Sequence, residues 1–217
     1  MSDKLHEFED AAIEVTWSKA RCVHVAECVR GLPQVFQPGR RPWVMPDRAA
    51  ADRVAEVVRR CPTGALHYER RDGGAPEAVP ESNTVVPTPY GPLYLRGDIQ
   101  VRGVDGATLL RDTRVALCRC GASKNRPFCD GSHWESGYRD PGVLGEGGSP
   151  PTAETPGTLR ITAGAGGPLY LEGRFLLASA RGGQGRELGE ASLCRCGRSG
   201  NKPFCDGSHA ETDLRER

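Results

Sequence analysis

The chain has 217 residues, a formal net charge of +1, nine cysteines and an aromatic content of only 6%. Glycine (28) and proline (17) are above average usage, so large apolar side chains are scarce and thin cores are expected. Basic and acidic residues are spread through the sequence, and no apolar stretch is long enough to cross a bilayer. These properties predict a soluble protein that binds neither nucleic acid nor membranes.

The nine cysteines are predicted to be metal ligands rather than disulfide partners. Their number is odd, and most of them cluster with histidine. Residues 1–12 also lack the basic-then-apolar profile of a secretory signal. Free thiols persist in a reducing compartment, so the predicted location is the cytoplasm.

Residues 1–69 are expected to form a small α+β unit. Apolar residues alternate at 13–17 and again at 66–68, which predicts two strands. Asp47 is expected to cap a helix that runs to about residue 60. The predicted apolar face of this helix consists of Ala50, Val54, Val57 and Val58.

This unit contains three cysteines, Cys22, Cys28 and Cys61, and the last of them precedes a proline. Bacterial ferredoxins carry a C-x2-C-x2-C run and a later C-P, but Val25 stands where the second cysteine would be. The unit resembles divergent single-cluster ferredoxin domains. Three thiolates suit a 3Fe-4S cluster, whereas a 4Fe-4S cluster needs a fourth ligand. His24 is the candidate, and an ordinary surface histidine is the equal alternative.

Two stretches rich in proline, glycine and charge, residues 70–82 and 139–157, are predicted to be linkers. They separate the N-terminal unit from two further segments, residues 83–138 and 158–217. The sequence GPLYL at 91–95 returns 76 residues later, so these two segments are copies of one structural unit.

Each copy contains apolar residues that alternate in short bursts with glycine between them, which predicts paired β-strands. The alternating residues are Leu93, Leu95, Ile99, Val101, Leu169, Leu171, Phe175 and Leu177.

A second repeated feature carries the chemistry, because CRCGASKNRPFCDGSH at 118–133 returns as CRCGRSGNKPFCDGSH at 194–209. Each copy has a C-x-C-x8-C-x3-H spacing, which is a metal or iron-sulfur constellation. Three cysteines and one histidine also form a common zinc site, and the spacing alone leaves that open. A disulfide between C-x-C neighbours is disfavoured by strain. The predicted ligands are Cys118, Cys120, Cys129 and His133 in the first copy and Cys194, Cys196, Cys205 and His209 in the second.

Both copies resemble the CDGSH iron-sulfur family, with its pattern C-x-C-x2-S-x3-P-x-C-D-G-S-H. The resemblance implies one 2Fe-2S cluster in each copy, with the histidine as the outermost ligand. Members with one motif form homodimers, and tandem members resemble that dimer fused into one chain. A monomer with an internal pseudo-dimer is therefore expected. The membrane anchor of some family members has no counterpart here, so an organelle-membrane location is not expected.

Other residues near the ligands have less specific expectations. Asp130 and Asp206 are expected to order their loops by accepting backbone N–H bonds. Arg119 and Arg195 lie between ligand cysteines and either balance the charge of a cluster or are solvated. Trp134 is expected to be a packing residue that could also shield the preceding histidine.

Together these observations predict an α+β chain with a small ferredoxin-like N-terminal unit and a β-rich tandem CDGSH pseudo-dimer whose cluster sites are built from loops. No nucleophile-elbow, P-loop or dinucleotide motif is present, so no enzymatic activity is expected. The predicted function is electron transfer to a redox partner through two 2Fe-2S clusters with pH-sensitive histidine ligands and a third 3Fe-4S or 4Fe-4S cluster. The alternatives are a carrier that donates 2Fe-2S clusters to apo-proteins and a zinc-stabilised binding module.

Overall fold

The computed structural model describes residues 4–152, 157–212 and 214, and the chain divides into two compact units, residues 1–78 and 79–217. The division falls within residues 70–82, where the composition predicts a linker. Throughout the described part of the chain, no helix has the length and apolar character that crossing a bilayer requires.

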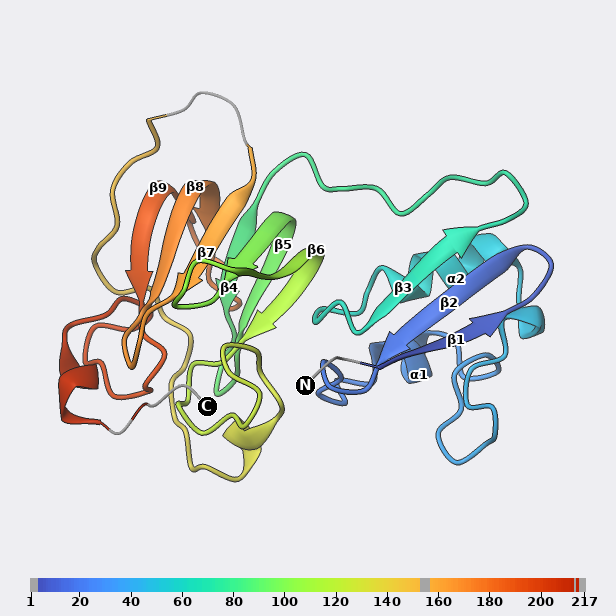
Figure 1. The fold of residues 1–217 in the computed structure, drawn as a ribbon, viewed down its shortest axis with the longest axis horizontal. Helices are drawn as coiled ribbons and strands as arrows, with labels where there is room; N and C mark the ends of the chain where they lie inside the picture. The colour runs from blue at the N-terminus through green and yellow to red at the C-terminus, as the bar shows by residue number, and fades with distance from the viewer. Residues whose placement is uncertain (1–3, 153–156, 213, 215–217) are drawn as a thin grey trace. The chain divides into compact units, whose positions relative to one another are not determined.

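The first unit is a three-stranded antiparallel sheet in the order β1-β2-β3, with two short helices and a 3-10 turn (Figure 1). Its elements are β1 (Leu5–Glu9), β2 (Ile13–Ser18), α1 (Glu27–Gly31), η1 (Pro46–Arg48), α2 (Ala51–Val58) and β3 (Leu66–Arg70). The central strand buries Ile13 and Val15 completely, and Leu66 and Tyr68 of β3 are buried beside it. Both strands predicted for this unit are confirmed.

The predicted helix exists, but its start was placed too early. Asp47 lies in the 3-10 turn η1, and Ala49 after it has an extended backbone, so the helix cannot continue from that turn. Helix α2 begins at Ala51 without a side-chain cap, and Ala50 before it is exposed. Ala55 takes the position in the core that was expected for Ala50. The buried face of α2 consists of Val54, Ala55, Val57 and Val58.

The second unit contains both repeats in one six-stranded sheet (Figure 1). Its elements are β4 (Thr84–Pro87), β5 (Leu93–Arg102), β6 (Thr108–Leu117), η2 (Ser132–Trp134), β7 (Leu159–Ala163), β8 (Leu169–Leu177), β9 (Arg186–Leu193) and η3 (Ser208–Glu211). The first part of β5 pairs antiparallel with β4, and its second part pairs in parallel with β7 of the other repeat. Strand β8 does the same with β7 and β4. Four strands therefore close a ring, and each repeat contributes two of them.

The ring has an internal two-fold symmetry in its pairing. In one parallel contact Gln100 lies opposite Arg160, and in the other Leu176 lies opposite Thr84. A shift of 76 residues converts the first pair into the second. The two repeats are thus joined in the same register on both sides.

The sequence pattern predicted two paired strands in each repeat, separated by a glycine. The structure differs from this prediction. Both bursts lie on one long strand, β5 or β8, and the glycine marks an irregularity within it. The pairing of β5 with β6 shifts register between Arg96 and Ile99, and Gly97 between them has a φ of 146°. Gly173 occupies the equivalent place in β8, with a φ of 118°. Such a bulge bends a strand, so each half can pair with a different neighbour.

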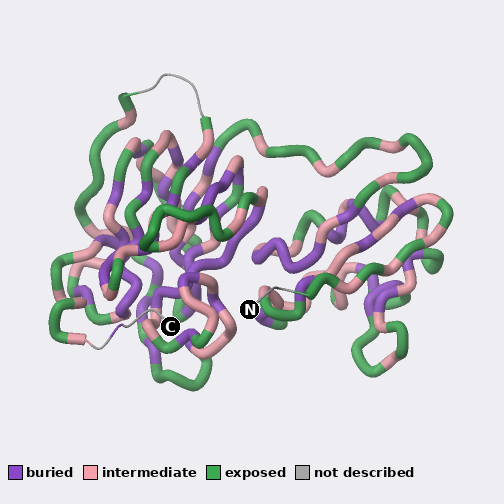
Figure 2. The backbone as a smooth tube through the Cα atoms, viewed as in Figure 1, coloured by how far each residue is buried: buried purple, intermediate pink, exposed green. Residues whose placement is uncertain are grey.

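The two repeats share one hydrophobic core. All eight apolar residues of the predicted alternating pattern belong to it, and each is at most 1% exposed. Figure 2 shows the backbone of this unit as a tube in which buried (purple) stretches alternate with intermediate (pink) and exposed (green) ones, as the alternating burial of β5 and β8 requires. A core composed of both repeats means that neither repeat has a complete core by itself.

Residues 139–152 connect the two repeats and also pack against them. The side chain of Asp140 is buried. The Gly145 N–H donates to the Lys202 carbonyl at 2.9 Å, and the Ser149 N–H donates to the Glu190 carbonyl at 2.9 Å. The high proline and glycine content here therefore accompanies an ordered strap. Residues 153–156 of the predicted linker lie outside the described residues.

The glycine bulge can be tested by replacing Gly97 with alanine. A Cβ atom at this position would lie 2.8 Å from the Cα of Asn83, and the φ is one that L residues rarely adopt. We expect Gly97→Ala to lower the free energy of unfolding by about 1–3 kcal/mol, measured by urea denaturation followed by circular dichroism. Gly106→Ala is the matched control, because Gly106 also has a positive φ but open space around it. Equal losses for the two variants would contradict a role for close packing at Gly97.

Candidate metal centres

The ligand segment of the first repeat is a loop that follows β6 and folds back onto the end of that strand. The Cys118 N–H donates to the Pro127 carbonyl at 2.9 Å, and the Cys129 N–H donates to the Ala116 carbonyl at 2.9 Å. The equivalent bonds of the second loop, shifted by 76 residues, are 2.7 and 2.9 Å long. Backbone pairing therefore brings cysteines that are distant in the sequence to the same end of each loop.

Within each loop the four predicted ligands lie in two close pairs. The Sγ atoms of Cys118 and Cys120 are 3.7 Å apart, and the Sγ of Cys129 lies 3.4 Å from the Nδ1 of His133. The equivalent pairs of the second loop are Cys194 with Cys196, at 3.7 Å, and Cys205 with His209, at 3.2 Å.

These distances fit ligand pairs that bind tetrahedral metal ions. Two thiolates at about 2.3 Å from one tetrahedral ion lie about 3.8 Å apart, and a thiolate and an imidazole nitrogen lie about 3.6 Å apart. A single zinc ion would require all four ligands to meet at one point. Among residues 4–152, 157–212 and 214, no three cysteine, histidine, aspartate or glutamate side chains are gathered in that way. The ligands of each loop therefore lie in two pairs, and each pair has the spacing of neighbouring ligands on one metal ion.

The protonation of the first site is suited to metal binding. The hydrogen bond from Cys118 lowers the pKa of the Cys120 thiol to about 6 and raises the pKa of Cys118 itself. Burial lowers the pKa of His133, which favours the neutral imidazole that binds metals. One thiolate and one neutral nitrogen are therefore available near neutral pH, and metal binding has to displace the remaining thiol protons.

Asp130 and Asp206 have the loop-ordering role expected from the sequence. Asp130 accepts hydrogen bonds from the Lys124 N–H at 2.8 Å and from the Ser132 hydroxyl at 2.7 Å. Hydrogen bonds from Ser208 and from a backbone N–H lower the pKa of Asp206. Both carboxylates hold the turn that carries the histidine ligand.

Arg119 and Arg195 are buried, so the expectation that they are solvated is wrong, and the balance of cluster charge stays a prediction. Their exposed fractions are 2% and 1%. The Nε of Arg119 donates to the Gly91 carbonyl at 3.0 Å, and the Nε of Arg195 donates to the Gly167 carbonyl at 3.1 Å. Each arginine ties its cysteine pair to the turn before the long strand of the same repeat. Each also places a permanent positive charge between two ligand cysteines.

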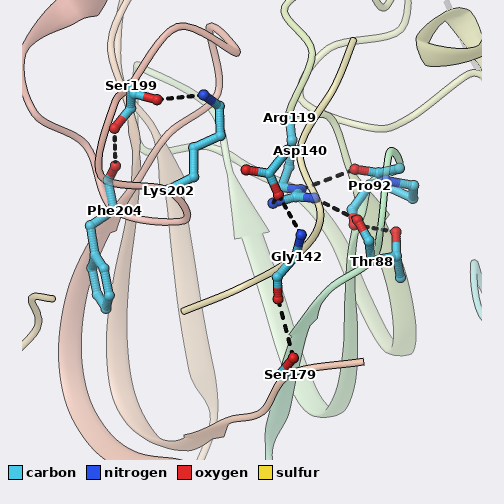
Figure 3. A network of polar contacts seen from close by, with 10 residues as sticks. Thr88, Pro92, Arg119, Asp140, Gly142, Ser179, Ser199, Lys202 and Phe204 are labelled. Carbon is cyan, nitrogen blue, oxygen red and sulfur yellow. Dashed lines mark hydrogen bonds and ion pairs between the residues drawn. The ribbon is translucent and has the colours of Figure 1, made fainter. Parts of the chain in front are cut away.

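Arg119 also joins the first site to the strap between the repeats (Figure 3). Its Nη1 donates to the buried Asp140 carboxylate at 3.1 Å, and its guanidinium lies 5.5 Å from the centre of the Tyr138 ring. The Gly142 N–H donates to the same Asp140 oxygen at 2.8 Å, and Ser179 donates to the Gly142 carbonyl at 3.2 Å. The sequence analysis missed Asp140 because it lies in a stretch with linker composition.

The two ligand loops contact each other through their main chains. A Cβ atom on Gly121 would lie 2.8 Å from the carbonyl oxygen of Cys196, and one on Gly197 would lie 3.1 Å from that of Cys120. These are the glycines that directly follow a ligand cysteine in each repeat. The absence of a side chain at both positions allows the two sites to lie next to each other.

In the first unit, Cys22, Cys28 and Cys61 line one small cavity. Burial raises the pKa of Cys28 to about 11, and the charges of Cys61 and Cys22 act in the same direction. Three thiols that influence one another in this way would favour a bound cation. The three predicted N-terminal ligands therefore line one cavity, although among the described residues no three cysteine, histidine, aspartate or glutamate side chains stand close enough to hold one metal ion.

Trp17 and Trp43 line the same cavity, and sequence analysis did not assign them to it. Their rings contact edge to face, with centres 4.9 Å apart. The indole Nε1 of each is buried and has no hydrogen-bond partner among the described residues. Buried N–H groups without partners are costly, and a sulfur-rich group in the cavity is an acceptor of the kind that they lack. The only sequence signal is the position of Trp17 a few residues before the first cysteine.

His24 lies at the rim of this cavity with an exposed side chain. Its φ is 55°, and the φ of Ala26 is 65°, both in the left-handed region that residues other than glycine rarely adopt. Strained backbone between Cys22 and Cys28 is typical of a loop shaped for binding. Whether His24 is a fourth ligand stays a prediction.

Family models match both units of the chain. Residues 8–71 match the divergent 4Fe-4S mono-cluster family. Residues 90–134 and 166–210 match the iron-binding zinc finger of CDGSH type, so the second unit contains this domain twice. The residues matched by these family models include His24 and the other eleven predicted ligands.

The chain is also similar to the uncharacterized protein YjdI of Escherichia coli strain K12, with 41% identity over 59 residues. The similarity covers 27% of this chain and 78% of YjdI, and the YjdI protein of Escherichia coli O157:H7 has the same values. No solved structure matches the chain significantly. The two repeated ligand loops, the N-terminal cysteine cavity and these matches together show that the chain belongs to the CDGSH iron-binding family, in a tandem form preceded by a divergent 4Fe-4S mono-cluster domain.

Proposed function

We propose that this iron-sulfur-binding protein transfers electrons and has no catalytic activity of its own. Each CDGSH loop would hold one 2Fe-2S cluster, and the N-terminal cavity would hold a third cluster of the 3Fe-4S or 4Fe-4S type. The observation that carries the proposal is the arrangement of each CDGSH ligand set in two pairs with the spacing of tetrahedral sites. When bound, such clusters take up and return single electrons.

The residues around the loops support this function. The imidazoles of His133 and His209 replace thiolates, so each site has one negative charge fewer than an all-cysteine site, and its reduction potential is higher. The buried guanidinium of Arg195 would stabilise the reduced, more negative state, whereas the charge of Arg119 is balanced by its ion pair with Asp140. The contact between the two loops at Gly121 and Cys196 brings the sites close enough to share electrons.

The expected partner is a redox protein, and the expected form is a cytoplasmic monomer. A monomer is supported by the closed ring of four strands, since the pairing that a dimer would supply is already present within one chain.

A second candidate function is donation of 2Fe-2S clusters to apo-proteins. It is supported by the second site, where Cys205 and His209 are only half-buried. Mixing the holoprotein with an apo-ferredoxin distinguishes the two functions. Appearance of both iron and sulfide in the acceptor supports donation, whereas reduction of a holo-ferredoxin without metal loss supports electron transfer. A zinc-stabilised module is disfavoured by the paired ligands.

Metal analysis of the anaerobically purified chain tests the proposed cofactors. We expect two irons and two sulfides for each CDGSH site, and three or four irons at the N-terminal site. Cys61→Ser should remove the third cluster and leave the visible absorption of the other two. Cys118→Ser is the matched variant for the first CDGSH site. Zinc in place of iron, with no acid-labile sulfide in any sample, would contradict the proposal.

The histidine ligands should make the potentials of the CDGSH sites depend on pH. A reduced site attracts a proton more strongly, so each potential should fall as pH rises, by up to about 59 mV per pH unit for one proton per electron. His133→Cys or His209→Cys should lower the potential of the altered site and abolish its pH dependence. Redox titrations between about pH 6 and about pH 9 measure both effects. Wild-type potentials that ignore pH would contradict this role, and His6→Ala is the control.

The two indoles of the N-terminal cavity should raise the potential of the cluster bound there. Hydrogen bonds to cluster sulfur stabilise the reduced state, and phenylalanine keeps the ring but has no N–H. Trp17→Phe and Trp43→Phe should therefore each lower this potential in a titration monitored by electron paramagnetic resonance. Trp134→Phe, in the other unit, should leave it unchanged. Unaltered potentials in both cavity variants would rule out these donors.

A further inference from the structure

The two CDGSH sites have the same ligands but differ in the solvent exposure of those ligands. In the first site the outer ligand pair is closed to solvent, with Cys129 3% and His133 4% exposed. In the second site the equivalent residues, Cys205 and His209, are only half-buried. The two loops share the backbone bonds that pair them with β6 or β9, but the segments after the histidines differ. The Ser136 N–H donates to the Ser132 carbonyl in the first repeat, whereas the Thr212 N–H donates to the His209 carbonyl in the second.

The residue directly after the histidine also differs between the two repeats. In the first repeat this is Trp134, whose ring centre lies 4.8 Å from that of His133 with the two planes 38° apart. Trp134 is itself 74% exposed and does not belong to the hydrophobic core. Its indole therefore covers the histidine from the solvent side. In the second repeat the same position is Ala210, which is too small to cover His209.

The segment after Trp134 holds this cover in place. The Ser136 N–H donates to the Ser132 carbonyl at 3.0 Å, which closes the turn that carries the tryptophan. A few residues later Tyr138 is buried against the guanidinium of Arg119. The indole thus projects from an anchored turn.

We propose that the two sites differ in how readily they release a cluster. Trp134 keeps the cluster in the first site, and an external thiol acceptor takes the cluster of the second site. This inference rests on the proposed binding of 2Fe-2S clusters. The transfer exchanges ligands only. Four thiolates of the acceptor replace Cys194, Cys196, Cys205 and His209. The three released cysteines take up three of the four protons that the acceptor thiols lose, and the fourth proton goes to His209 or to solvent. Iron and sulfide keep their oxidation states.

The reason is access to the outer ligand pair. Ligand exchange begins when an incoming group reaches the metal side of the histidine or the neighbouring thiolate. At the second site that pair is in contact with solvent, whereas at the first site the indole has to move away. An aromatic contact of this kind is worth about 0.5–1.5 kcal/mol, which corresponds to about a two- to tenfold slower exchange.

The test uses the full chain loaded with its clusters and an excess of an apo-2Fe-2S ferredoxin near neutral pH. The change of the visible absorption and circular dichroism spectra from those of the CDGSH clusters to those of the holo-ferredoxin is recorded over time. We expect two phases of equal amplitude for the wild type. Trp134→Ala should accelerate the slow phase by about two- to tenfold and leave the fast phase unchanged. Trp134→Phe should keep most of the slow phase, because a ring still covers the histidine. Ala210→Trp should slow the fast phase.

The possible outcomes separate this inference from the proposed function. Full iron and sulfide in the starting protein, together with one common rate for both CDGSH clusters or no effect of Trp134→Ala, would overturn the inference alone. Starting protein without sulfide would overturn both. Because Trp134 and Ala210 lie outside the hydrophobic core, the variants are expected to fold, and their far-ultraviolet circular dichroism checks this.

Discussion

Each repeat completes its β-structure with a strand of the other repeat, and the metal centres depend on this exchange. Strands β5 and β8 divide their pairing between the two repeats at Gly97 and Gly173. The closed ring fixes β6 and β9, which pair with these strands. Both ligand loops begin where β6 and β9 end, so the ring also determines where the cysteines lie. The contact of Gly121 with Cys196 follows from this arrangement.

Each ligand loop packs one phenylalanine, Phe128 or Phe204, against the hydrophobic core, and buried polar contacts hold the rest of the loop. Arg119 and Arg195 each link a C-x-C pair to the turn before a long strand. Asp140 neutralises Arg119 and fastens the strap between the repeats. An uncompensated buried charge is costly, so these guanidinium groups and their acceptors form one structural unit with the loops.

Features coded by local spacing could be predicted from the sequence. The C-x-C-x8-C-x3-H pattern predicted eight ligands, and the loops after β6 and β9 bring these residues into close pairs. Alternating apolar residues likewise identified the buried faces of β5 and β8. The sequence could not show that Gly97 bends one strand instead of separating two, since bulges and turns share glycine. It also could not show that Asp140 is buried, because its partner Arg119 is distant in the sequence. The helix start was misplaced because Asp47 is a good cap in a segment that forms a 3-10 turn.

The ring formed by both repeats has a consequence for how the two sites can evolve. In a symmetric homodimer every substitution changes both sites at once, so a change that harms one site cannot be confined to the other. Fusion of the repeats removes this restriction, and a mutation at Trp134 leaves Ala210 as it was. One gene can therefore specialise two sites that began as identical copies, while the shared core keeps them in one molecule.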